Sequence, residues 1–183
     1  MTVIERVAGV LRLQPRAFED IEADVHANGQ ALGIVVLSTL AAGVGGGFYG
    51  GPGGMVAEAL GAVVGWVMWA AVTYVLGARL LPERDTRTDM GELLRVMGYS
   101  SAPTFFSVFA ALPLLGRAVP SIVSFWLLAT TVLAVRQALD YRSTMRAFAV
   151  VIIGWLLFVA IRDIGMPWLS QRFQPSSKYW CQR

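Results

Sequence analysis

The sequence predicts an all-α protein, a polytopic membrane helix bundle of five transmembrane helices with a short amphipathic N-terminal helical region. Of the 183 residues, 56% are apolar and only 15% are charged, which is too apolar for a water-exposed domain of this size. Long apolar runs also alternate with short arginine-bearing loops from Ala31 to Ile161. Lipid is therefore the expected solvent for most of these side chains.

Residues 1–28 form the first expected unit, an N-terminal segment made of two short helices. Apolar residues recur at helical spacing at Val3, Val7, Val10 and Leu11. Glu5, Arg6 and Arg12 fall off this stripe, and Pro15 suits the first position of the second helix, because proline lacks an N–H. The pair either lies on the membrane surface or forms a soluble cytoplasmic cap packed on the loops.

Residues 29–162 are expected to form the membrane domain, followed by a polar tail at 163–183. The five predicted spans are 31–48, 56–80, 93–115, 119–135 and 147–161. The first span, about 18 residues or about 27 Å at 1.5 Å each, is long enough for the hydrocarbon core, and the shorter fifth span should insert because it is strongly apolar. The glycine-rich stretch between the first two spans predicts a flexible turn at the far interface.

Small residues share one face of each of the first two spans. Gly43 and Gly47 do so on the first, and Ala57, Gly61 and Gly65 do so on the second at a spacing of four. Such faces let helix backbones approach closely in lipid. The expected use is packing between these two helices, with homodimerisation as the second option.

Pro103 interrupts the third apolar segment and predicts a kinked helix. It removes one helical hydrogen bond and frees the carbonyl of Tyr99, which needs another donor in lipid. Hydroxyl groups at Ser100, Ser101 and other nearby positions are expected to provide it. The polar side of the kink should therefore face the interior of the bundle.

Two pairs of opposite charge lie at helical spacing near the predicted cytoplasmic ends of spans. They are Glu92 with Arg95 and Arg136 with Asp140. Each is expected to form a local ion pair.

Arginine distribution predicts a cytoplasmic N-terminus. With five spans, ten of the fifteen basic residues lie on the inner side, as the positive-inside rule favours. If the third segment is instead re-entrant, the tail returns to the cytoplasm and twelve basic residues lie inside. Five spans are favoured because 93–115 is long enough to cross, so an impermeant maleimide should label Cys181 from outside.

The residues that chemistry requires are sparse. The single Cys181 and the single His26 exclude a structural zinc site and a CxxC redox motif, and no cofactor is expected. The scattered arginines lack the contiguous basic face that nucleic acid would demand. Asp20 and Asp24 would share one helix face, but surface solvation is the simpler interpretation, and no catalytic residue is predicted.

Residues 98–103, Gly-Tyr-Ser-Ser-Ala-Pro, resemble the GYS-x-x-P segment of the Yip family of Ypt/Rab-interacting membrane proteins. The motif residues are Gly98, Tyr99, Ser100 and Pro103. The lead-in at 11–24 and the run from Trp126 to Tyr141 resemble the bacterial branch of that family, and the resemblance covers about 11–162.

The resemblance implies a five-span bundle with a cytoplasmic N-terminus, in a bacterial inner membrane. Eukaryotic members are associated with Rab GTPases, but this chain lacks their acidic Asp-Leu-Tyr-Gly-Pro-type motif, so no Rab GTPase is expected. The favoured function is a non-catalytic membrane scaffold or accessory subunit that contacts membrane lipids and forms a homo-oligomer or a larger membrane complex. The alternative is a small-solute transporter or channel component that uses the kinked third helix.

Overall fold

The computed structural model describes residues 1–46, 51–83, 86–112, 114–116 and 118–165, and every regular element in these ranges is a helix. The α-helices are α1 (Val3–Leu11), α2 (Pro15–Ala23), α3 (Ala27–Gly46), α4 (Gly51–Tyr74), α5 (Met90–Ser100), α6 (Ala118–Ala138) and α7 (Thr144–Gly165). The π-helical turn η1 (Val75–Leu80) continues α4, and the 3-10 helix η2 (Ala102–Ala111) follows α5.

Three of the helical stretches are long and apolar enough to cross a membrane. They are Ala27–Gly46, Gly53–Leu80 and Ala118–Ala138. The predicted third and fifth spans coincide with the α5–η2 pair, which changes helix type near Ser101, and with α7, whose apolar part Thr144–Ala160 is shorter. Because few residues of the three long stretches are buried inside the protein, their outer surfaces are apolar and suited to lipid.

The N-terminal region contains two short helices, as its pattern predicts. Thr2 and Glu5 form a capping box at the start of α1, each side chain receiving a backbone N–H from the other residue. Leu13 turns the chain with a φ of 56°, and Pro15 then begins α2. The short connection folds α2 back against α1.

Glycine interrupts the first two spans less than expected. α3 continues through Gly46 and α4 begins at Gly51, so both helices include glycines of the predicted turn, and the rest of that turn, 47–50, lies outside the described residues. In an apolar environment, intrahelical hydrogen bonds outweigh the weak helix propensity of glycine. Gly45 also allows a close approach, because a side chain there would overlap the Ser107 carbonyl oxygen of η2.

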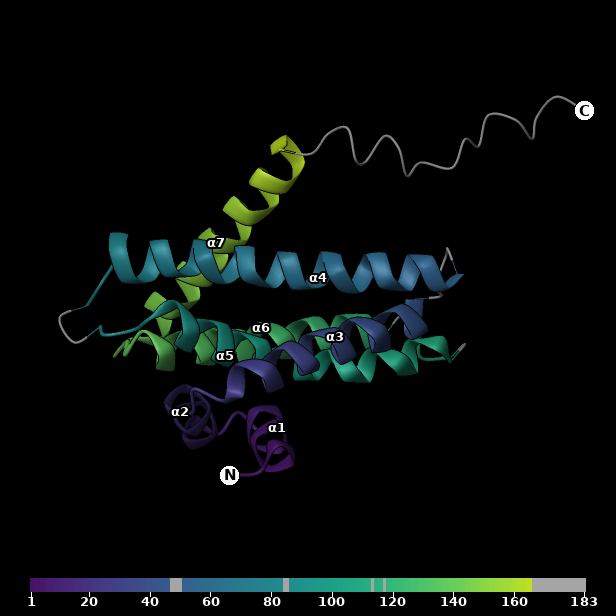
Figure 1. Ribbon diagram of the computed structural model, residues 1–183, viewed down its shortest axis with the longest axis horizontal. Helices are drawn as coiled ribbons and strands as arrows, with labels where there is room; N and C mark the ends of the chain where they lie inside the picture. The colour runs from purple at the N-terminus through teal and green to yellow at the C-terminus, as the bar shows by residue number, and fades with distance from the viewer. Residues whose placement is uncertain (47–50, 84–85, 113, 117, 166–183) are drawn as a thin grey trace, which may run out of the picture.

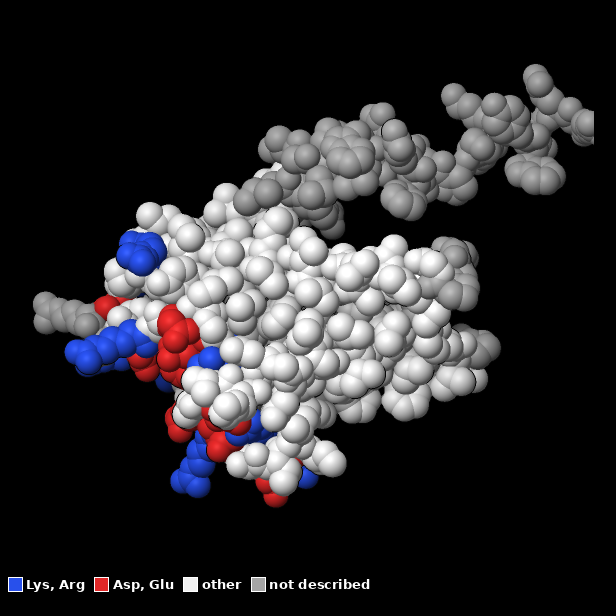
Figure 2. Space-filling model, in the orientation of Figure 1, with Lys and Arg blue, Asp and Glu red and all other residues white. Residues whose placement is uncertain are grey.

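Helices α3 and α4 contact each other, α6 packs against α5, η2 and α7, and α3, α4 and α6 all extend along the long axis of the molecule while α7 runs obliquely to it (Figure 1). α1 and α2 pack on the flank near one end, where α3 begins. On the face drawn in Figure 2, the acidic and basic residues gather at this end and over α1 and α2, while the rest of the described surface is uncharged. This part of the molecule is called the charged end below.

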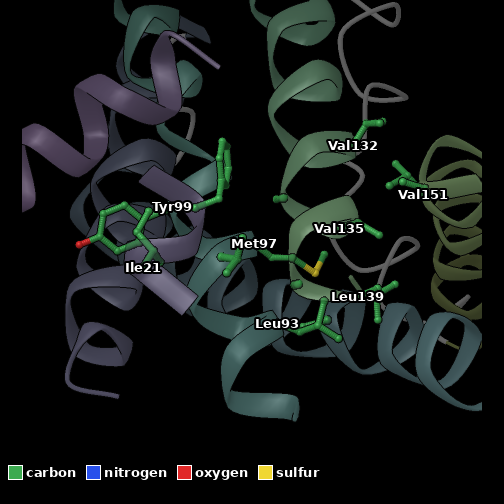
Figure 3. Close-up of a cluster of buried hydrophobic side chains, with 14 of the residues drawn as sticks. Ile21, Leu93, Met97, Tyr99, Val132, Val135, Leu139 and Val151 are labelled. Atoms are coloured by element: carbon green, nitrogen blue, oxygen red, sulfur yellow. The ribbon is translucent and has the colours of Figure 1, made fainter. Parts of the chain in front are cut away.

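The buried core also lies toward the charged end, where α2, α5, α6 and α7 meet (Figure 3). Its labelled members are Ile21, Leu93, Met97, Tyr99, Val132, Val135, Leu139 and Val151. The side chain of Leu139 packs against Gly77, where any other residue would overlap it. The Tyr141 hydroxyl lies 3.0 Å from the Gly77 carbonyl oxygen, so the turn after α6 secures the π-helical end of α4.

Candidate functional site

The kink between α5 and η2 is held by hydroxyl groups from neighbouring helices. Pro103 lies in the first turn of η2, where the chain passes from α-helical to 3-10 geometry. Thr130 of α6 donates its hydroxyl to the Ser100 carbonyl at 2.8 Å, and Ser38 of α3 donates to the Ser101 carbonyl at 3.1 Å. The carbonyl groups at the break are therefore satisfied from both sides of the bundle.

The serines of the kink have a different role from the predicted one. Ser100 Oγ donates to the Met97 carbonyl and Ser101 Oγ to the Gly98 carbonyl, both at 2.7 Å. A serine hydroxyl on a helix reaches the carbonyl three or four residues before it. The donors to the kink consequently come from α3 and α6, which the sequence pattern does not reveal.

Gly98 brings the backbones of α5 and α3 into contact. A Cβ atom at this position would lie 2.7 Å from the Cβ of Ala31 and 3.2 Å from its Cα and carbonyl oxygen. Because two of these three atoms belong to the α3 backbone, a rotamer change cannot relieve the overlap. Glycine at 98 thus sets the spacing of the two helices beside the kink.

Tyr99 connects the kinked helix to the N-terminal helices. Its side chain is fully buried, and its hydroxyl donates to Gln30 Oε1 at 2.5 Å. The same oxygen accepts from Arg6 Nη1 at 3.1 Å, and Arg6 forms ion pairs with Asp20 at 2.7 Å and Asp24 at 2.8 Å. These five residues, the Tyr99 network, link α1, α2, α3 and α5.

Arg6 is the central charge of this network. Its hydrogen bonds hold the pKa of Asp20 and of Asp24 below the usual range of an aspartate. Arg6 falls off the apolar stripe of α1, yet only 5% of the residue is exposed. Its acidic partners are Asp20 of α2 and Asp24, the residue that follows α2, and this pair, interpreted as solvated from the sequence, is the signal for the buried arginine.

A second cluster of charge surrounds Arg95, close to the C-terminal end of α2. Arg95 is 4% exposed and donates through Nη2 to the Glu22 carbonyl oxygen at 2.6 Å, where the carbonyl end of a helix favours a cation. Burial, followed by the nearby charges of Asp140 and Glu92, raises the pKa of Glu22 to about 7, against a lowering effect of Arg95. Glu22 therefore titrates near neutral pH.

The two predicted ion pairs have other partners in the structure. The Glu92 carboxylate accepts the N–H of its own N-cap residue, which completes a capping box, while Arg95 reaches across to α2. Arg136 Nε donates to the Tyr141 carbonyl at 3.3 Å. α6 ends at Ala138, so Asp140, with a φ of 52°, lies beyond the helix and outside helical i, i+4 geometry.

The predicted small-residue faces do not meet one another. Ala57 is exposed, an added Cβ on Gly61 would contact nothing within 4 Å, and Gly65 faces α7, with a phenyl carbon 3.7 Å away. Gly43 is partly exposed, and Gly47 lies outside the described residues. The glycines at which neighbouring elements approach closely are instead Gly98, beside the kink, and Gly77, in η1.

The polar groups at the kink and in the Tyr99 network bond chiefly to one another and to backbone. Within the described ranges, no group of three His, Cys, Asp or Glu side chains is arranged to hold a metal ion. The predicted absence of catalytic, cofactor and metal residues stays a prediction. The arrangement suits a mechanical connection between the N-terminal helices and the bundle.

Comparison with known proteins identified one family. The model of the Yip1 domain matches residues 8–161 of the chain. No curated protein and no solved structure matched it.

Proposed function

This chain belongs to the Yip1 domain family, and on that premise we propose that it is a non-catalytic membrane scaffold or accessory subunit, acting through helix–helix contacts in a homo-oligomer or a larger complex. The observation that carries this proposal is that the family motif is occupied internally. Gly98 spaces two helices, Tyr99 bonds to Gln30, and the kink carbonyls of Ser100 and Ser101 receive hydroxyls from α6 and α3. A motif whose residues contact other helices of the same protein holds those helices in a defined arrangement.

The outer face of α4 supports a scaffold role. Val56, Leu60 and Val64 are each more than 60% exposed and lie at i, i+4 and i+8, on the side away from the bundle. Lipid can solvate such a ridge, and a partner helix can pack against it, because Ala57 and Gly61 beside it leave room for close approach. The proposed contacts with membrane lipids and with a partner both use this surface.

The topology proposed is five spans with a cytoplasmic N-terminus, in the inner membrane of a bacterium. The N-terminal helices, the connector before α5 and the turn after α6 lie at one end with most of the arginines, which the positive-inside rule assigns to the cytoplasm (Figure 2). The pair α5–η2 then serves as the third span and α7 as the fifth. Labelling of Cys181 by an impermeant maleimide only after lysis would overturn this topology.

The transporter alternative receives less support. Its predicted polar cavity would require free hydroxyls at the kink, yet Ser100, Ser101, Thr130 and Ser38 each bond to a carbonyl oxygen. A polar surface engaged in this way offers few groups to a solute. No Rab GTPase is proposed as a partner, and none of the proposed contacts involves nucleic acid.

The scaffold proposal is tested by the mass of the assembly. The chain weighs 19.8 kDa, so native mass spectrometry of material extracted in polymer-bounded lipid discs should give an oligomer or a stoichiometric heteromer. Gly61→Leu should weaken that assembly, because its side chain would occupy the open space at Gly61 beside the exposed ridge. Ile122→Ala, on the exposed face of α6, is the control that should leave it intact. A monomer with no partner contradicts the proposal.

A further inference from the structure

Four buried side-chain donors have no hydrogen-bond partner among the described residues, and three of them lie on α4, the fourth being Arg95 Nε. The indole nitrogens of Trp66 and Trp69 and the hydroxyl of Thr73 are buried and have no hydrogen-bond partner among the described residues. They lie on α4 at positions i, i+3 and i+7, which share one face of a helix over about 10 Å. A buried donor left unbonded is costly, so an acceptor from another molecule would be strongly favoured.

Thr73 differs from other threonines in the spans. Thr39 donates to the Val35 carbonyl of its own helix at 2.9 Å, and Thr130 donates to the Ser100 carbonyl of α5 at 2.8 Å. Thr73 is fully buried and makes no such bond. Its hydroxyl is therefore available to a group outside α4.

Two of the three α4 donors, those of Trp69 and Thr73, lie beside Gly154 of α7. A Cβ added at Gly154 would lie 3.7 Å from Thr73 Oγ1, 3.8 Å from Trp69 Nε1 and 3.5 Å from a Leu76 methyl carbon, all ordinary van der Waals distances. Packing alone would therefore admit alanine at 154. Glycine leaves the space beside the two donors open by about one methyl group.

The surroundings define the chemistry of the missing acceptor. Residues 59–78 of α4 and η1 and residues 147–160 of α7 contain no charged side chain. A carboxylate or phosphate would have no cation to balance it at this depth, whereas a neutral oxygen needs only the donors present.

We propose that the α4–α7 interface binds a neutral oxygen acceptor beside Gly154, which receives the Trp69 N–H and the Thr73 O–H. Trp66 donates to a second oxygen farther from the charged end. The acceptor is either a buried water or a carbonyl, ether or hydroxyl oxygen of an apolar molecule such as a lipid ester. Neither the family assignment nor the scaffold role is needed for this site.

Substitution at Gly154 tests the site by the direction in which it changes the melting temperature. Gly154→Ala fits sterically, so a merely apolar gap would be filled and the protein would become more stable. If the gap admits an acceptor, the methyl group displaces it, and the melting temperature should fall by several degrees relative to Gly33→Ala, which changes a helical glycine of α3 whose added methyl meets nothing within 4 Å. Gly154→Ser should recover most of the loss, because its hydroxyl oxygen can itself accept from the donors.

The donors provide the second arm of the experiment. In a Trp69→Phe/Thr73→Val background, Gly154→Ala should no longer lower the melting temperature relative to Gly33→Ala, and the coupling is read as a double-mutant cycle. If Gly154→Ala is as stable as Gly33→Ala, or if it costs the same stability in both backgrounds, the proposal is overturned.

Native mass spectrometry separates the two sources of the acceptor. An adduct on the wild-type protein that is absent from Trp69→Phe/Thr73→Val identifies an apolar molecule, and its mass gives the class. Coupling between Gly154→Ala and Trp69→Phe/Thr73→Val in the melting temperatures, with no adduct on the wild-type protein, identifies water.

Discussion

Replacing Gly98 by alanine tests whether the motif glycine sets the distance between α3 and α5. The new Cβ would lie 2.7 Å from the Cβ of Ala31 and 3.2 Å from two backbone atoms of the same residue. Carbon atoms pack best at roughly 3.5–4.0 Å, so the two helices must move apart. Overpacking costs about 1–3 kcal/mol, and the higher helix propensity of alanine offsets about 1 kcal/mol. The expected net loss in the free energy of unfolding is about 1 kcal/mol.

Unfolding in mixed micelles of a mild detergent and dodecyl sulfate, followed by tryptophan fluorescence, measures this loss. Gly33→Ala in α3 is the matched control, because its methyl group meets no neighbour and it retains only the propensity effect. Gly98→Ala should cost less in an Ala31→Gly background than in the wild type, because the closest contact is then absent. Equal stability of Gly98→Ala and Gly33→Ala would refute the role given to Gly98.

Three further predictions concern the polar groups at the charged end and the kink. The pKa of Glu22 is raised from 4.5 to about 7 in the folded state. Between these two pH values the folded protein keeps a proton on Glu22 that the unfolded chain has lost. The free energy of unfolding should therefore fall as pH rises from about 5 to 8. The full pKa difference corresponds to about 3 kcal/mol of stability, which solvent screening of this half-exposed carboxyl group reduces to about 1–2 kcal/mol. Melting curves measured across this pH range should show the effect in the wild type and not in Glu22→Gln. Tyr99→Phe should cost about 1 kcal/mol in the unfolding assay, because the Gln30 oxygen keeps a second donor, and a loss above about 3 kcal/mol would show that the network is more cooperative than its bonds suggest. Thr130→Val leaves the buried Ser100 carbonyl without its hydroxyl donor and should cost about 1–3 kcal/mol in the free energy of unfolding. Thr131→Val is the control and should cost less, because it loses only a 3.4 Å contact. The reverse order would count against the account of the kink.

Several elements were predictable because their causes are local. The apolar stripe and Pro15 predict the two N-terminal helices, and the apolar runs predict the long helices, since lipid requires each backbone group to bond within its own segment. The motif at 98–103 identifies the family, which the match over residues 8–161 confirms. The position of the break near Pro103 follows from the missing proline N–H.

The partners of the polar residues were not predictable in the same way. The spacing of Glu92 with Arg95 satisfies the helical rule for an ion pair, but a capping box and the end of α2 provide nearer partners. The spacing of Arg136 with Asp140 fails because α6 ends between them. A sequence rule assumes that the helix continues and that no other element competes.

Sequence alone determined the all-helical character, the apolar surface for lipid and the family, because each depends on composition and local periodicity. Tertiary structure alone decided that Tyr99 meets Gln30, 69 residues away in the chain, and that Arg6 is buried between acidic residues of α2. It also decided that Thr73 and Trp69 face a glycine on α7. The physical reason is that hydrogen bonds are short and directional, so they report the relative placement of whole helices, which no local pattern specifies.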